Sequence, residues 1–238
     1  MEFDVILRPE NLQLFLDGTL QSLALLLSSL VVGGALSLPL SLARVARSRW
    51  IHAPVWAFTY VMRGTPLLIQ VYLIYYGLAQ MDFIQSRWDH SLFWQWFKEP
   101  FFCAALAFAL NTCAYTTELL AGAIKDLPHG EIEAAQACGM NRLTLLRRIV
   151  LPAAMRRSLP GYSNEVIMML HSTSLASTVP ALLDITGAAR SIYAEFYLPF
   201  EAFITAGLIY ACLTALLIFL FRLAEMRWLA HLRPRQAD

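Results

Sequence analysis

Five long apolar segments constrain this chain more than any other feature. A helix needs about 20 predominantly apolar residues to cross a bilayer, and each segment is long enough. Charged residues make up only 15% of the chain, whereas soluble domains have about 25%. The sequence therefore predicts an all-α integral membrane protein with one transmembrane domain over residues 1–238. Its expected spans are at about 20–43, 55–78, 101–124, 159–183 and 202–221.

Lysine and arginine positions predict the orientation of these spans. Cytoplasmic loops carry an excess of both residues. The connections after the first, third and fifth spans are rich in them. We therefore expect the N-terminus outside, the C-terminus inside and the 125–157 loop in the cytosol. The basic residues on the expected inner side are Arg44, Arg47, Arg49, Lys125, Arg142, Arg147, Arg148, Arg156, Arg157, Arg222, Arg227, Arg233 and Arg235, and those on the outer side are Arg8, Arg87, Lys98 and Arg190.

The 125–157 loop contains a helix–turn–helix pattern. Glu133, Ala134 and Ala135 favour a short helix, and Gly139 can take the positive φ that ends it. We expect a second helix over 143–149 that closes before Pro152. Such a hairpin either docks in a groove of a cytosolic partner or lies along the membrane surface as an amphipathic linker.

Three ionisable residues, Arg63, Glu118 and Glu165, lie inside predicted spans. A charge at this depth needs a partner or a water-filled cavity. Arg63 belongs to a break in the second span, since Pro66 removes a helical hydrogen bond, and Gln70 follows one turn later. Irregular backbone inside a membrane must be buried in protein or line a cavity.

Two polar helix faces accompany these charges. Asn111, Tyr115 and Glu118 share a face of the third span, and Asn164 lies beside Glu165 on the fourth. These residues are either ligands in a transport pathway, where an acid attracts a cationic solute, or a buried network in which Arg63 pairs with a glutamate. The aromatic connection at 79–100 is either an interfacial helix or a docking surface for a binding protein. We expect the four cysteines to be small buried residues without a disulfide framework.

Several strings resemble those of polar amino-acid permeases of ABC importers. The string Glu-Ala-Ala-x-x-x-Gly over 133–139, followed by Ile-x-Leu-Pro over 149–152, is similar to the loop with which importer membrane subunits dock on the ATPase. The strings at 63–70, 111–118, 128–135 and 162–166 are similar to signatures of the same permeases. Together they look most like the M-type subunits of histidine and lysine/arginine/ornithine importers, over about residues 18–235.

This resemblance implies a type I importer permease with five transmembrane helices and a coupling helix between spans three and four. It places the chain in the bacterial inner membrane among lipids, where it transports histidine, arginine, lysine and ornithine. The implied partners are an ATP-binding subunit dimer, which holds ATP and Mg, a homologous Q-type permease subunit and a periplasmic amino-acid-binding protein. The residues implied for substrate binding are Glu165, Asn164, Glu118 and Tyr115, and the polar segments of the spans add Asn111, Arg63 and Gln70. The residues implied for ATPase coupling are Glu133, Ala134, Ala135 and Gly139.

The expected chain is a transport subunit rather than an enzyme, and it binds no cofactor, metal or nucleic acid itself. It has no Gly-x-x-x-x-Gly-Lys-Ser/Thr phosphate loop. Other functions remain open: a structural partner subunit without a substrate site, a homodimeric permease, or an importer of a neutral polar amino acid such as glutamine. A secondary transporter or channel is a further alternative, but the sequence shows no inverted repeat.

Overall fold

The computed structural model describes residues 3–78, 80–86 and 92–228, and every regular element in these ranges is helical. Three of the helices, α2, α7 and α12, are long and apolar enough to cross a membrane. The elements are α1 (Phe3–Ile6), α2 (Pro9–Arg44), α3 (Arg49–Gly64), α4 (Leu67–Tyr72), η1 (Leu73–Leu78), α5 (Asp82–Gln85), α6 (Leu92–Gln95), η2 (Trp96–Lys98), α7 (Pro100–Lys125), α8 (His129–Ala137), α9 (Arg142–Leu145), η3 (Leu146–Val150), α10 (Leu151–Ser172), η4 (Thr173–Thr178), α11 (Ile185–Phe196) and α12 (Pro199–Trp228). The all-α prediction is confirmed.

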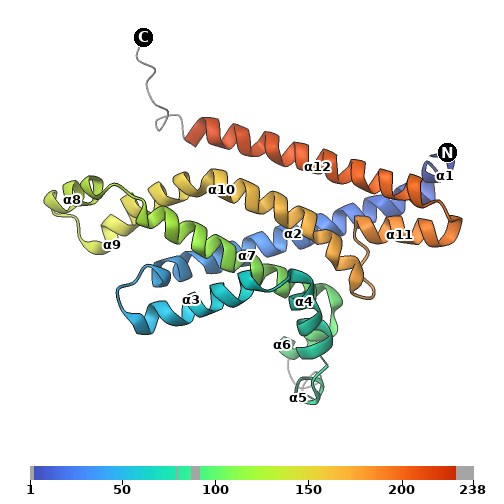
Figure 1. The fold of residues 1–238 in the computed structure, drawn as a ribbon, viewed down its shortest axis with the longest axis horizontal. Coiled ribbons are helices and arrows are strands. Elements are labelled where there is room, and N and C mark those ends of the chain that lie inside the picture. Colours follow the sequence, from blue (N-terminus) through green and yellow to red (C-terminus); the bar gives the residue numbers. More distant parts are fainter. Residues whose placement is uncertain (1–2, 79, 87–91, 229–238) are drawn as a thin grey trace, which may run out of the picture.

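The two ends of the molecule differ in which connections they hold. Figure 1 shows the α2–α3 connection, the α8–α9 hairpin and the C-terminal end of α12 at one end. The N-terminus and α11 lie at the opposite end. The first end carries the basic connections at 44–49 and 125–157, and we call it the basic end. Four residues of the predicted connections lie outside the described residues. They are the basic residues Arg87, Arg233 and Arg235, and Trp88 of the aromatic connection.

The core is centred on α2 packed along α7, and α10 packs against both helices. Ser29, Gly33 and Ser37 recur every four residues on the buried face of α2. A Cβ added to Gly33 would lie 2.6 Å from the carbonyl oxygen of Ala109, so only glycine allows this approach. Small residues at this spacing let helix backbones come close inside a membrane. Each serine hydroxyl donates to a carbonyl of its own helix, at 2.7 to 2.8 Å.

The second predicted span is broken, as the sequence indicated. Helix α3 ends at Gly64, the chain is extended at Thr65 and Pro66, and α4 begins at Leu67. Gln70 Nε2 donates to the carbonyl oxygens of Met62 at 2.7 Å and Thr65 at 3.1 Å. Asn111 Nδ2 in turn donates to Gln70 Oε1 at 3.2 Å and to Met62 O at 3.3 Å. These side chains therefore satisfy backbone groups that the break releases.

The predicted hairpin begins with α8, which ends in a left-handed residue. Gly139 has φ +76°, and its N–H donates to Gln136 O at 2.9 Å. The Met140 N–H donates to Ala135 O at 3.2 Å, which completes a Schellman motif. Asn141 then caps α9, with its Oδ1 accepting from the Thr144 N–H at 2.8 Å. The prediction that the helix ends at Gly139 is confirmed.

The prediction that the second helix covers 143–149 and closes before Pro152 is wrong. Helix α9 continues through the π turn η3 into α10, so the chain is helical from Arg142 to Ser172. Pro152 lies in the first turn of α10. A π turn shifts the hydrogen-bond pattern by one residue. Pro152 has no N–H to donate, and we infer that the shift in η3 lets the helix continue without this donor. Part of the expected loop therefore belongs to the helix that carries Glu165.

Helix α11 was absent from the sequence prediction. Asp184 caps its N-terminus and accepts from the N–H groups of Thr186 at 3.0 Å and Gly187 at 2.9 Å. Burial raises the pKa of Asp184, although these donors oppose the shift. The buried side chains of Ile185 and Ile192 pack α11 against α2 and α12. The sequence signal was a capping aspartate before a helical apolar period.

The cysteines follow the predictions only in part, and the aromatic connection packs against α7. All four cysteines are free, and Cys103 and Cys113 are buried as expected. Cys138 and Cys212 are exposed, so the expectation that all four are buried is wrong. In the aromatic connection, Phe97 packs edge-on against Phe102 of α7, with ring centroids 5.2 Å apart. This contact anchors the connection to α7 and leaves its two predicted roles open.

Candidate functional site

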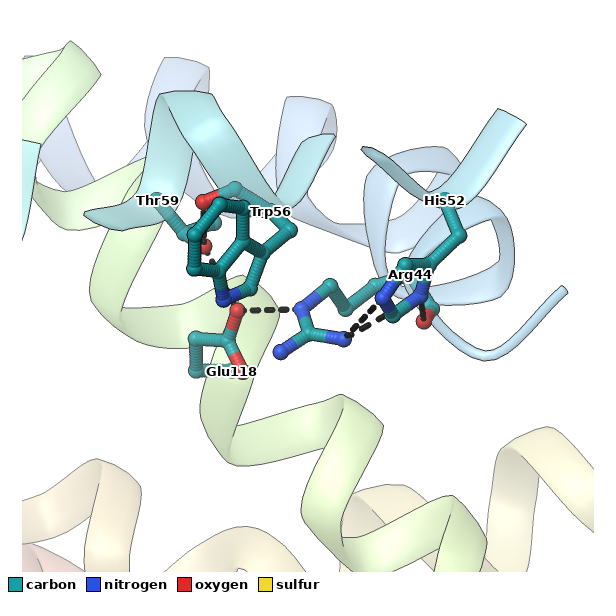
Figure 2. Close-up of polar contacts among 5 residues, drawn as sticks. All are labelled: Arg44, His52, Trp56, Thr59 and Glu118. Atoms are coloured by element: carbon teal, nitrogen blue, oxygen red, sulfur yellow. Dashed lines mark hydrogen bonds and ion pairs between the residues drawn. The ribbon is translucent and has the colours of Figure 1, made fainter. Parts of the chain in front are cut away.

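Glu118 of α7 is the most firmly held of the predicted site residues (Figure 2). Its Oε1 accepts from Arg44 Nε at 2.5 Å and from Thr59 Oγ1 at 2.6 Å. The Arg44 and Glu118 side chains are only 13% and 20% exposed. This pair therefore ties α7 to α2 and α3. The hypothesised network paired a glutamate with Arg63, but the ion-pair partner of Glu118 is Arg44.

His52 extends this cluster on the α3 side. One of its ring nitrogens, Nδ1, lies 2.6 Å from the carbonyl oxygen of Arg44. The Arg44 guanidinium nitrogen Nη1 lies 3.2 Å from the same ring nitrogen. The cluster thus fixes the α2–α3 turn as well as the glutamate. Sequence reasoning missed Arg44, Thr59 and His52 because only packing brings them to Glu118.

Arg63 lies near Tyr115 and forms no ion pair with a residue that the structure describes. Its guanidinium carbon is 5.1 Å from the centre of the Tyr115 ring, which is the geometry of a cation–π contact. Arg63 is exposed, and Tyr115 is 36% exposed. Arg63 also interacts electrostatically with Glu118 and Glu165. A cation held by a ring face at the helix break can turn toward an anionic ligand.

Glu165 and Asn164 lie on α10. Asn164 is exposed and Glu165 is partly buried. Unlike Glu118, Glu165 has no hydrogen bond or ion pair to another residue in the described ranges, and the same holds for the Asn164 side chain. Their polar groups are therefore available to a ligand or a partner subunit.

The structure thus separates the seven predicted substrate residues. Arg63, Tyr115, Asn164 and Glu165 keep some exposure, and none of their side chains has a hydrogen bond within the described residues. Gln70 and Asn111 are buried, and their amide nitrogens bond within the helix break. Glu118 is held by Arg44 and Thr59. The first four residues are all at least partly exposed, so a site built from them opens on the surface of this single chain.

The predicted coupling residues divide in a similar way. Glu133 and Ala134 are exposed on α8. Ala135 is buried in a small core that includes Leu127, Leu145 and Val150. Gly139 shapes the turn. Glu133 and Ala134 are therefore the pair that a docking partner can reach, whereas Ala135 and Gly139 hold the hairpin together.

Three helices long and apolar enough to cross a membrane, together with a broken helix pair and a capped hairpin at the basic end, are features of a membrane protein, and the comparisons identify its class as a membrane transport subunit. The chain belongs to the family of binding-protein-dependent transport system inner membrane components, which it matches over residues 35–229. It is 48% identical over 219 residues to the histidine/lysine/arginine/ornithine transport system permease protein HisM of Escherichia coli (strain K12), covering 91% of this chain and 90% of HisM. It is 45% identical over 225 residues to the octopine transport system permease protein OccM of Rhizobium meliloti, covering 94% and 90%.

Solved structures show the same fold. A crystal structure of an amino acid ABC transporter with histidines aligns with a TM-score of 0.77 and 28% identity, covering 92% of this chain and 95% of that chain. An inward-facing structure of the MetNI methionine ABC transporter aligns with a TM-score of 0.75 at 17% identity, covering 93% and 99%. The predictions of an ABC importer permease family, an inner membrane component and a transport subunit rather than an enzyme are confirmed.

Proposed function

We propose that this chain is a membrane subunit of an ABC importer that moves histidine, arginine, lysine and ornithine into the bacterial cytoplasm. One observation carries the substrate class: within the described residues, the partly buried Glu165 carboxylate, beside Asn164 on α10, has no hydrogen bond or ion pair. The identity of 48% with HisM supports the same substrates. ATP and Mg bind to a separate ATPase dimer.

The proposed topology has five spans, with the N-terminus outside and the C-terminus inside. Helices α2, α7 and α12 supply three spans. The broken pair α3–α4 and the more polar α10 supply the others, since their irregular or polar segments face protein rather than lipid. The basic end then lies in the cytosol, as the positive-inside rule requires, and residues 1–238 form one transmembrane domain.

The proposed substrate site lies between the helix break and α10. A cationic side chain pairs with Glu165, and the amide of Asn164 orients it. Arg63 leaves the ring of Tyr115 and binds the carboxylate of the amino acid. Glu118 and Gln70 with Asn111 support the site by holding α7 and the break in place. A Q-type permease subunit completes the pathway, and a periplasmic binding protein delivers the amino acid.

The proposed coupling path starts at α8. The exposed Glu133 and Ala134 dock on the ATPase dimer. The hairpin core links α8 to the continuous helix that begins at Arg142. Glu165 lies about 35 Å along this helix, at 1.5 Å per residue. A displacement of the hairpin by ATP binding therefore moves the Glu165 carboxylate as part of one rigid element.

Uptake by a Glu165→Gln variant tests the substrate class. The assay measures uptake of arginine, lysine, histidine and glutamine by cells that express the variant with its partner subunits. We expect uptake of the cationic substrates to fall at least tenfold, because an amide cannot neutralise a cation. A tenfold fall corresponds to a loss of roughly 1.4 kcal/mol of binding free energy. Octopine belongs in the same panel because OccM is a relative.

Glu195→Gln is the matched control, since Glu195 is an exposed carboxylate on α11, away from α10. Complex assembly and basal ATPase activity are measured for both variants. If Glu165→Gln assembles and transports arginine normally, the carboxylate is structural and the substrate class must come from the partner subunit. If glutamine is the preferred substrate of the unmodified complex, the importer is one for neutral polar amino acids.

A further inference from the structure

An apolar crevice lies beside Trp228, the last residue of α12, near the basic end. Its volume is about 300 Å³, and helices α2, α7, α10 and α12 form its walls. Ala35, Leu38, Leu120 and Leu159 give it an apolar lining. Along α10 it reaches from Met155 to Tyr162, a length of about 10 Å at 1.5 Å per residue. This depth suits the first part of a lipid acyl chain.

The mouth of this crevice is basic. A second cavity of about 400 Å³ shares Met155 and Trp228 with the first, so the two are adjacent. Arg156 of α10 and Arg227 of α12 line it. Both arginines are exposed, and neither forms an ion pair with any residue that the structure describes. Two unpaired guanidinium groups beside a tryptophan are typical of a lipid headgroup region.

One wall of the crevice carries an unsatisfied hydroxyl. Thr116 is only 4% exposed and lines the crevice, and its Oγ1 has no hydrogen-bond partner. Thr112 and Thr117 are also unsatisfied, but they do not line the crevice. A buried hydroxyl without a partner is costly, but this oxygen has less than 1 Å² of accessible surface, so the binding of a ligand in the crevice does not depend on it.

We propose that this crevice binds one anionic phospholipid, with its phosphate between Arg156 and Arg227 and an acyl chain along α10. The apolar lining selects a chain, and the paired arginines select a negative headgroup over a zwitterionic one. The lipid links the last turns of α12 to the start of α10, close to the hairpin. The assignment of this lipid to the cytosolic leaflet rests on the proposed topology, but its binding does not depend on the transported substrate.

Native mass spectrometry of the purified complex with its partner subunits tests this site. The detergent-solubilised complex is titrated with phosphatidylglycerol or phosphatidylcholine. We expect tight binding of one phosphatidylglycerol per copy of this chain. Since each basic residue near a membrane surface contributes about fivefold to the binding of anionic lipid, Arg156→Gln and Arg227→Gln each weaken it about fivefold, and the double variant about twenty-fivefold.

Two further variants separate charge from shape. Arg222→Gln is the control for charge, because Arg222 is an exposed arginine on α12 that does not line the mouth, and it leaves binding unchanged. Ala35→Phe fills the crevice from an exposed position of α2 and weakens the binding of both lipids. The proposal is overturned if the two lipids bind equally, or if the double arginine variant binds phosphatidylglycerol normally. It is also overturned if Ala35→Phe blocks assembly of the permease pair with lipid binding unchanged, because the partner subunit then covers the crevice.

Discussion

Replacement of Gly139 by alanine should loosen the α8–α9 hairpin without creating a clash. The residue has φ +76°, and a Cβ added there would meet no heavy atom within 4 Å. The cost is therefore conformational alone, about 1–2 kcal/mol for an L-residue in the left-handed region. A factor of ten in an equilibrium corresponds to about 1.4 kcal/mol, so local opening of the hairpin should become about 5 to 30 times more frequent.

Hydrogen exchange of the Gln136–Asn141 segment in the assembled complex measures this opening directly. The N–H groups of residue 139 and Met140 donate within the Schellman motif, so their protection should fall by the same factor. Substrate-stimulated ATPase activity and uptake should fall with it if the hairpin couples the ATPase to α10. Gly139→Asn should restore most of the protection, since asparagine tolerates positive φ better than alanine.

Gly130→Ala is the matched control for this experiment. Gly130 lies in α8, and a Cβ there would also meet open space, but its φ is negative, so alanine should favour the helix. Equal loss of protection in Gly130→Ala and Gly139→Ala would refute the conformational argument. Normal transport together with a loosened hairpin would refute the coupling role of this loop.

Three further predictions concern packing and polar contacts, each measured as thermal stability of the complex in detergent. Gly33→Leu should destabilise the α2–α7 contact by about 1–3 kcal/mol or more because it overfills the crossing, whereas Gly34→Ala, whose Cβ would lie 3.9 Å from its nearest neighbour, should be tolerated. Gln70→Ala should cost about 1–3 kcal/mol because two carbonyls at the helix break lose a donor; an unchanged stability would mean that water replaces the amide. Glu118→Gln should cost about 1.5–3 kcal/mol by weakening a charge-assisted bond, and its effect should overlap with that of Arg44→Gln in a double-mutant cycle, so strictly additive costs would contradict the pairing.

Local rules of chain conformation account for several elements of this fold. The apolar segments predicted helices that cross a membrane, and Pro66 predicted the break because proline lacks an N–H donor. Gly139 predicted the end of α8, since glycine reaches positive φ at little cost. The basic connections also gather at one end of the molecule. The break at Pro66 and the end of α8 each depend on residues within a few positions of one another, so the sequence pattern contains the information.

Tertiary structure decided which polar groups are paired. The sequence left both Glu118 and Glu165 open as ligands or as members of a buried pair. In the structure Arg44, 74 residues away, pairs with Glu118, and Glu165 has no such partner among the described residues. The serine–glycine stripe of α2 and the packing of α11 depend on distant helices in the same way. Pro152 did not end its helix because an adjacent π turn accommodates it. In a membrane protein the energy of a polar residue depends on its neighbour across a helix interface, and only the packed helices identify that neighbour.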